Sequence, residues 1–166
     1  MFEYHGEFAD FDRCGFGAKP VQNPHPPIYF SGLKDPKRSA SRIAKYGLAG
    51  WIGIQDTPED IAMWRKEIQR ELEEMGSDRK LDDSFDMCSM IWFTITDEPT
   101  DQTPNRKLSN LLVGTASQIT DNLKRYKEAG MNMPLIWPPF TGVPVSKTLD
   151  DLKRLKEEIL PKVNAI

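Results

Sequence analysis

Short apolar segments alternate with segments of helical periodicity along most of this 166-residue chain. The apolar segments are residues 27–30, 50–54, 87–96 and 133–137. Short runs of apolar and β-branched residues are typical of strands that are buried on both faces. The helical segments follow them at residues 35–46, 57–75, 115–130 and 148–163. Four such strand–helix units in succession predict an α/β fold with a parallel sheet.

Capping signals predict where the helices begin and end. Asp35 and Thr57 are each followed by a proline, so an N-cap side chain precedes a proline at the first helical position. Gly47 predicts the end of the first helix. Apolar residues recur at helical spacing in the second helix at Ile61, Trp64, Ile68, Leu72 and Met75. The last helix carries Leu152, Leu155, Ile159 and Val163.

The first 27 residues have a different character. Residues 4–21 alternate weakly between apolar and polar positions and contain turn glycines, which predicts an irregular hairpin or loop. Residues 21–27 contain three prolines and are expected to be extended, because proline removes a backbone donor and restricts its predecessor.

Charge and composition exclude several classes of protein. The net charge is −3, so no basic surface for nucleic acid or an anionic membrane is expected. No apolar run approaches the length of a membrane span, and residues 1–10 lack the features of a signal peptide. Cys14 and Cys88 stand in unrelated contexts, which indicates neither a disulfide framework nor a zinc site. We therefore expect a cytoplasmic protein with reduced cysteines and no metal.

No self-sufficient catalytic constellation is visible, and the catalytic residues are unknown from sequence. His5 and His25 are the two histidines, and both are expected on the surface or in loops. The run Cys14 to Gly17 lacks the third glycine of a dinucleotide fingerprint. Asp97 and Glu98 are adjacent carboxylates in a proline-containing loop, where we expect them to be solvated.

The strongest local candidate for a site is the end of the first apolar segment, at Ser31 and Gly32. A glycine there allows close backbone approach to a ligand, and the amides at the start of the following helix can donate to a phosphate. Lys34 adds a positive charge. An ordinary turn between a strand and a helix explains the same residues, and both interpretations stay open.

Several segments, in this order, resemble the luciferase-like monooxygenase family. They are residues 6–8, the proline-rich stretch 19–32, residues 44–51, the Gly-Thr-x-x-Gln-Ile stretch 114–119 and residues 127–130. Two positions depart from the family pattern. Leu48-Ala49 stands where Gly-Asp is usual, and Ala116-Ser117 replaces Pro-Glu.

The resemblance implies a (β/α)₈ barrel that uses reduced flavin mononucleotide (FMN) or, in some branches, the deazaflavin F420. The cofactor would lie at the C-terminal face of the barrel, where the loops after the strands converge. The resemblance assigns cofactor contacts to Ser31 and Gly32, with Leu33 and Lys34 as weaker neighbours. Trp51 is also family-like, although packing in the core is at least as good an explanation for it.

The length is short for that fold, since a complete (β/α)₈ barrel takes about 250 residues. Residues 1–166 are therefore expected to be the C-terminal half of the barrel, with residues 1–27 as an inserted hairpin and proline-rich lead-in and residues 28–166 as the βα units. We expect either a fragment of a longer product or a chain that pairs, as a homodimer or with a complementing N-terminal half; closure as a small open sheet is the third outcome.

The predicted function is that of a flavin-dependent monooxygenase that positions reduced flavin for oxidation of a small organic substrate. Two alternatives remain open: a non-catalytic half-barrel that binds flavin or serves in assembly, and an F420-dependent reductase of the same fold.

Overall fold

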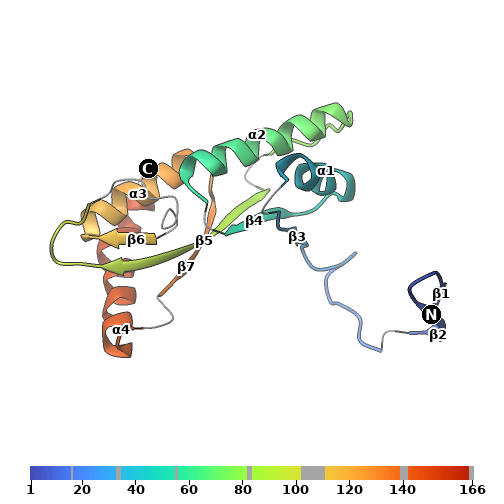
Figure 1. The fold of residues 1–166 in the computed structure, drawn as a ribbon, viewed down its shortest axis with the longest axis horizontal. Helices are drawn as coiled ribbons and strands as arrows, with labels where there is room; N and C mark the ends of the chain where they lie inside the picture. Colours follow the sequence, from blue (N-terminus) through green and yellow to red (C-terminus); the bar gives the residue numbers. More distant parts are fainter. Residues whose placement is uncertain are drawn as a thin grey trace.

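The computed structural model describes residues 1–15, 17–32, 35–54, 56–81, 84–101, 111–138 and 142–164. Its centre is a parallel sheet in which four strands lie side by side in chain order (Figure 1). These strands are β3 (Tyr29–Phe30), β4 (Gly50–Ile54), β5 (Asp86–Ile95) and β7 (Met133–Trp137). A further short strand, β6 (Leu111–Gly114), pairs in parallel with the end of β5. The predicted α/β class with a parallel sheet is confirmed.

Helices follow the strands as the sequence predicts. They are α1 (Pro36–Tyr46), α2 (Pro58–Glu74), α3 (Ala116–Glu128), and a last helical region made of α4 (Val145–Arg154), the π-helical segment η1 (Leu155–Ile159) and α5 (Leu160–Asn164). No described helix is long and apolar enough to span a membrane.

The capping residues Asp35, Gly47 and Thr57 act as expected, and Thr115 caps a third helix. The Asp35 carboxylate accepts a hydrogen bond from the Arg38 amide at 3.0 Å. Gly47 ends α1 in the left-handed conformation, with φ of 60°, which L side chains rarely adopt. Thr57 at α2 and Thr115 at α3 each form a capping box with the residue three positions on.

The helices share one core with one face of the sheet. Alternate residues of β5 belong to this core, because side chains on a strand point to opposite faces in turn. The core draws on every βα unit, with fully buried members that include Ile43, Trp51, Ile61, Ile68, Met87, Ile91, Ile119 and Ile159.

No helix of the described residues packs on the opposite face of the sheet. The strand register aligns Ile52, Cys88 and Met133 across three strands, and Ile54, Met90 and Leu135 at the next level. We call this surface the open face; it consists of the side chains of Tyr29, Ile52, Ile54, Asp86, Cys88, Met90, Trp92, Met133, Leu135 and Trp137. Most of them are partly exposed, and three apolar ones, Ile54, Met133 and Trp137, are 37–40% exposed.

The N-terminal residues form the hairpin that the sequence suggested. Strands β1 (Phe2–His5) and β2 (Asp10–Cys14) pair in an antiparallel ladder. Every residue of both strands is exposed. Phe11 contacts Phe2 and Tyr4, with ring centroids 5.6 and 5.9 Å apart. The hairpin lies away from the sheet and helices, beyond the β3 edge (Figure 1).

Three expectations about individual elements were wrong. The strand at 27–30 is reduced to two half-buried residues, because β3 has a neighbour on one edge only within the described chain. The last helix begins at Val145 and not at Thr148, after Pro144, which supplies no side-chain cap. Leu152 is 40% exposed whereas Asp151 is buried, so the predicted apolar stripe does not hold there. Its lower part, Leu155 and Ile159, is buried as expected.

Candidate functional site

The carboxyl ends of the parallel strands meet at one edge of the sheet, which is where barrels of this type bind ligands. Ser31 and Gly32 follow β3, Asp56 follows β4, and Thr96 follows β5. This C-terminal edge is the candidate site. The predicted contacts Leu33 and Lys34 lie outside the described residues.

Gly32 is explained by packing against α1. A Cβ atom on Gly32 would lie 1.7 Å from Ser39 Oγ and 2.5 Å from Ser39 Cβ. Any side chain at this position would therefore push the turn away from the helix. This observation favours the ordinary strand–helix turn as the reason for the glycine, while the neighbouring Ser31 is exposed and available to a ligand.

The N-terminus of α1 already holds an anion of its own. The Arg38 amide donates a hydrogen bond to the Asp35 carboxylate, so this donor is not available to a phosphate. Its negative charge also repels a phosphate at the same position. The geometry therefore weighs against a phosphate held by this helix end alone.

Trp51 lies in the core, and its side chain is fully buried. Its ring stacks at a tilt on that of Trp64 from α2, with centroids 4.9 Å apart. Within the described residues, its Nε1 has no hydrogen-bond partner. This position favours core packing over the cofactor contact that the resemblance assigned to it.

Asp56 is a buried carboxylate just beneath the C-terminal edge, with 8% of its surface exposed. Ser89 Oγ, in the middle of β5, donates a hydrogen bond to Asp56 Oδ2 at 2.9 Å. The Tyr126 hydroxyl, from α3, donates to the Asp56 backbone oxygen at 2.7 Å. Through these two hydrogen bonds, Asp56 links the end of β4 to β5 and α3.

The environment of Asp56 raises its pKa to about 6, chiefly because burial disfavours the charged form. Hydrogen bonds from Ser89 and Trp64 act in the opposite direction, and the Asp60 carboxylate adds to the increase. The same burial raises the pKa of the Tyr126 hydroxyl above its usual range. A carboxyl group with a pKa near neutrality can exchange protons with a ligand. Here it faces the helix side of the sheet, where its contacts are structural.

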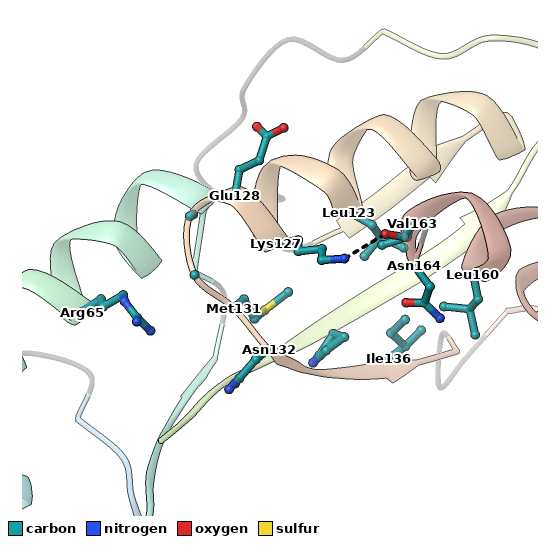
Figure 2. A pocket seen from close by; sticks show the side chains of 13 residues that line it. Arg65, Leu123, Lys127, Glu128, Met131, Asn132, Ile136, Leu160, Val163 and Asn164 are labelled. Carbon is teal, nitrogen blue, oxygen red and sulfur yellow. Dashed lines mark hydrogen bonds between the residues drawn. The ribbon is translucent and has the colours of Figure 1, made fainter. Parts of the chain in front are cut away.

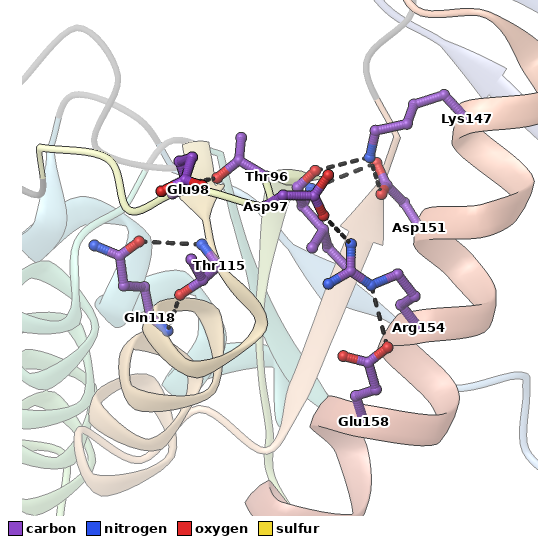
Figure 3. A network of polar contacts seen from close by, with 10 residues as sticks. Thr96, Asp97, Glu98, Thr115, Gln118, Lys147, Asp151, Arg154 and Glu158 are labelled. Carbon is purple, nitrogen blue, oxygen red and sulfur yellow. Dashed lines mark hydrogen bonds and ion pairs between the residues drawn. The ribbon is translucent and has the colours of Figure 1, made fainter.

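A second polar cluster joins the end of β5 to the last helical region (Figure 3). Lys147 Nζ donates to the Ile95 backbone oxygen at 2.7 Å and pairs with the buried Asp151 carboxylate. Arg154 reaches Asp97 at 3.3 Å and Glu158 at 3.1 Å. The Asp97 side chain is 94% exposed, which confirms the expectation of a solvated carboxylate. This cluster fixes α4 beside the C-terminal edge.

Neither histidine lies at the C-terminal edge of the sheet. His5 pairs with Asp10 on the exposed hairpin, and His25 Nδ1 lies 2.7 Å from the Pro26 oxygen in the lead-in. Both are exposed, as predicted. Across the described ranges, no group of three or more histidine, cysteine, aspartate or glutamate side chains is placed to hold a metal ion.

A cavity of about 560 Å³ lies at the other end of the strands. Figure 2 shows its lining, which comes from the end of α3, the start of β7 and α5, with Arg65 of α2 to one side. Because the cavity opens at the N-terminal ends of the strands, it is remote from the candidate site.

Comparison with solved structures shows the fold. The chain is similar to an F420-dependent secondary alcohol dehydrogenase solved with an F420–acetone adduct, with a TM-score of 0.69 and 16% identity over 98% of this chain and 56% of that one. The monooxygenase RslO1 from Streptomyces bottropensis gives a TM-score of 0.70 and 16% identity, over 96% and 55% of the two chains. The fold is a partial luciferase-like barrel.

A third neighbour is the oxygenating constituent of 3,6-diketocamphane monooxygenase from Pseudomonas putida, solved with FMN. It gives a TM-score of 0.66 and 12% identity, over 97% of this chain and 58% of that one. The chain thus spans little more than half the length of these enzymes. No protein-family model matches its sequence, nor does any curated protein. The resemblance predicted from the sequence is confirmed for the fold.

The sequence did not single out Asp56 or Asp151. Asp56 stands directly beyond an apolar strand, which is a position where functional side chains occur in parallel sheets. This position after the strand is the sequence signal that could have identified Asp56. Its partners Ser89 and Tyr126 are 33 and 70 residues away in the chain, so no local pattern connects them.

Proposed function

We propose that this chain supplies the C-terminal part of a luciferase-like oxidoreductase, and that its cofactor is reduced FMN in a monooxygenase. The observation that carries the proposal is the succession of four βα units that matches two monooxygenases and an F420 enzyme over 96–98% of this chain. The order of motifs in the sequence supports the same assignment. Small organic molecules are the proposed substrates.

The residues at the C-terminal edge fit a flavin in part. The open face ends there in the partly exposed side chains of Ile54 and Trp137, which offer an apolar surface to a ring system. Ser31 offers a hydroxyl, and Gly32 allows the backbone to come close. We propose that these two, with Leu33 and Lys34, contact the cofactor. The bound flavin would supply the oxygen chemistry, and this chain would orient it and exclude water.

We assign no catalytic residue. The chain is proposed to act with a partner that completes the barrel, either a second copy or a complementing N-terminal half. Residues 1–27 are proposed to be an insertion in the barrel, followed by its βα units in residues 28–166. A cytoplasmic location with reduced cysteines is proposed, because both described cysteines are free.

Titration with the two cofactors tests the proposal. FMN fluorescence is expected to be quenched saturably on addition of the protein, and F420 is expected to bind at least about tenfold more weakly. Ser31→Ala should weaken FMN binding about tenfold, which corresponds to the loss of one hydrogen bond. Ser77→Ala, beyond α2 at the opposite edge of the sheet, is the matched control and should leave the affinity unchanged.

The outcomes separate the candidate functions. Tighter binding of F420 than of FMN would replace the monooxygenase by an F420-dependent reductase; the F420-dependent secondary alcohol dehydrogenase among the neighbours supports that cofactor. Binding of FMN with no oxygen consumption beyond that of free FMN and the same reductant would indicate a non-catalytic flavin-binding half-barrel. Binding of neither cofactor would overturn the proposed function and leave the fold.

A further inference from the structure

The chain exposes more surface than a compact protein of its size. Its accessible surface is 11179 Å². A folded monomer of 19.0 kDa is expected to expose about 8,400 Å² by the scaling of surface with mass. The excess is about 2,800 Å² per chain, or about 5,600 Å² for two copies, which is at the upper end of the total area that obligate interfaces bury. A large part of this surface is therefore available for contact with protein.

The exposed apolar surface is concentrated in three places. The first is the open face, with Ile54 and Trp137 at its C-terminal end. The second is α4, where Val145, Leu149 and Leu152 follow one another at helical spacing and are 75%, 62% and 40% exposed. The third is the N-terminal hairpin, where Phe2, Tyr4, Phe8 and Phe11 are 36–93% exposed.

These three places lie beside the two edge strands of the sheet, β3 and β7. Within the described chain, β3 pairs with β4 alone and β7 with β5 alone, so each has one unpaired edge. The hairpin extends beyond the β3 edge (Figure 1), and α4 follows β7. A two-stranded hairpin is marginally stable by itself in water, and open strand edges invite pairing. Among the described residues, nothing covers the two edge strands or the open face between them.

We propose that two copies of this chain close into one eight-stranded barrel. A half-turn about an axis along the strands keeps all strands parallel and brings the β7 edge of each copy against the β3 edge of the other. The strands β3, β4, β5 and β7 of each copy then give the eight that the barrel requires, and each edge strand gains a partner. The short β6, which pairs with the end of β5, lies outside this count. The open faces become the barrel interior, and α4 of each copy gains a neighbouring helix.

The charges of the open face are compatible with a second copy. Asp86 is its one charged side chain among the described residues, and it accepts a hydrogen bond from the Tyr29 hydroxyl of the same chain at 2.5 Å. Both residues lie at the N-terminal ends of their strands, which is the opening of the proposed barrel opposite the candidate site. Each copy therefore brings its carboxylate with a donor already in place.

The inference deepens the proposed function, because closure would assemble the C-terminal edge from both copies. Its test needs no cofactor, so it can fail independently of flavin binding. Light scattering on the purified chain is expected to give twice the chain mass of 19.0 kDa. A mass of one chain with cooperative unfolding would overturn the proposal, and so would larger species, which indicate open-ended pairing.

Substitutions on the open face and on α4 test which surface forms the interface between the two copies. Ile54→Asp, on the open face, should raise the dissociation constant of the dimer at least about a hundredfold, because each copy would bury a carboxylate without a partner. Met63→Asp is the matched control, since Met63 lies on α2 and is 39% exposed against 40% for Ile54. It should leave the dimer intact.

Leu149→Asp, at a position that is 62% exposed, should weaken the dimer without unfolding the chain, as circular dichroism would verify. A dimer that tolerates both Ile54→Asp and Leu149→Asp would place the interface elsewhere and refute barrel closure.

Discussion

The buried carboxyl group of Asp56 should make the stability of the fold depend on pH. Its pKa is about 6 in the folded chain against an ordinary value of 3.8. The folded state therefore binds the proton more tightly than the unfolded state between these two values. Stability from this group is fully present below pH 3.8 and is lost as the pH rises through 6. The difference in pKa corresponds to about 3 kcal/mol of unfolding free energy.

Asp56→Asn isolates this contribution, because the amide keeps the size of the side chain and an oxygen that can accept from Ser89. The measurement is urea unfolding of the parent and the variant from pH 4 to pH 8. The stability of Asp56→Asn relative to the parent should increase across this range by about 2.5 kcal/mol, with most of the change between pH 4 and pH 6.5. All other titrating groups are common to both chains and cancel in the difference.

Asp121→Asn serves as the control, since Asp121 is exposed on α3. Its curve should run parallel to that of the parent. If Asp56→Asn also gave a parallel curve, the carboxyl group would be as well solvated in the folded chain as in the unfolded one. The reasoning from burial would then be wrong.

Three further changes test the local packing. Gly32→Ala should cost about 2 kcal/mol in denaturant unfolding, because the new methyl group overlaps Ser39, and adding Ser39→Gly should recover part of the loss in a double-mutant cycle. Lys147→Met should cost about 3 kcal/mol by leaving the Asp151 carboxylate buried without its cation, and Asp151→Leu in the same chain should restore most of it; no recovery would contradict the pairing. Thr115→Ala should cost about 1 kcal/mol by removing the cap of α3, measured as a fall in the denaturation midpoint.

The strand–helix succession could be predicted because its signals are local. A capping side chain, a proline and a terminal glycine lie within one helix, and each acts through the backbone next to it. The helix from Pro36 to Tyr46 therefore begins and ends where Asp35 and Gly47 indicated. Strand β5 was equally visible, since a strand with neighbours on both edges is apolar along most of its length.

Elements that depend on distant partners could not be predicted in the same way. Strand β6 has four residues, and its strand character comes from its pairing with the end of β5. In the last helical region, the buried residues Asp151, Leu155 and Ile159 lie four positions apart, so the buried side passes through Asp151 and not through Leu152. Asp151 is buried there because Lys147 pairs with it, which is a contact that the pattern of apolar residues does not encode.

The same distinction explains why the candidate site is less predictable than the fold. The sequence correctly predicts that Ser31 and Gly32 lie at the C-terminal edge, because they directly follow a strand. It gave no means of choosing between a ligand and packing, and the structure shows packing at Gly32 and Trp51. A half-barrel also leaves half of its binding edge undetermined. In the proposed two-copy barrel, the residues that face Ser31 come from the second copy, so the test of closure comes before any assignment of catalytic side chains.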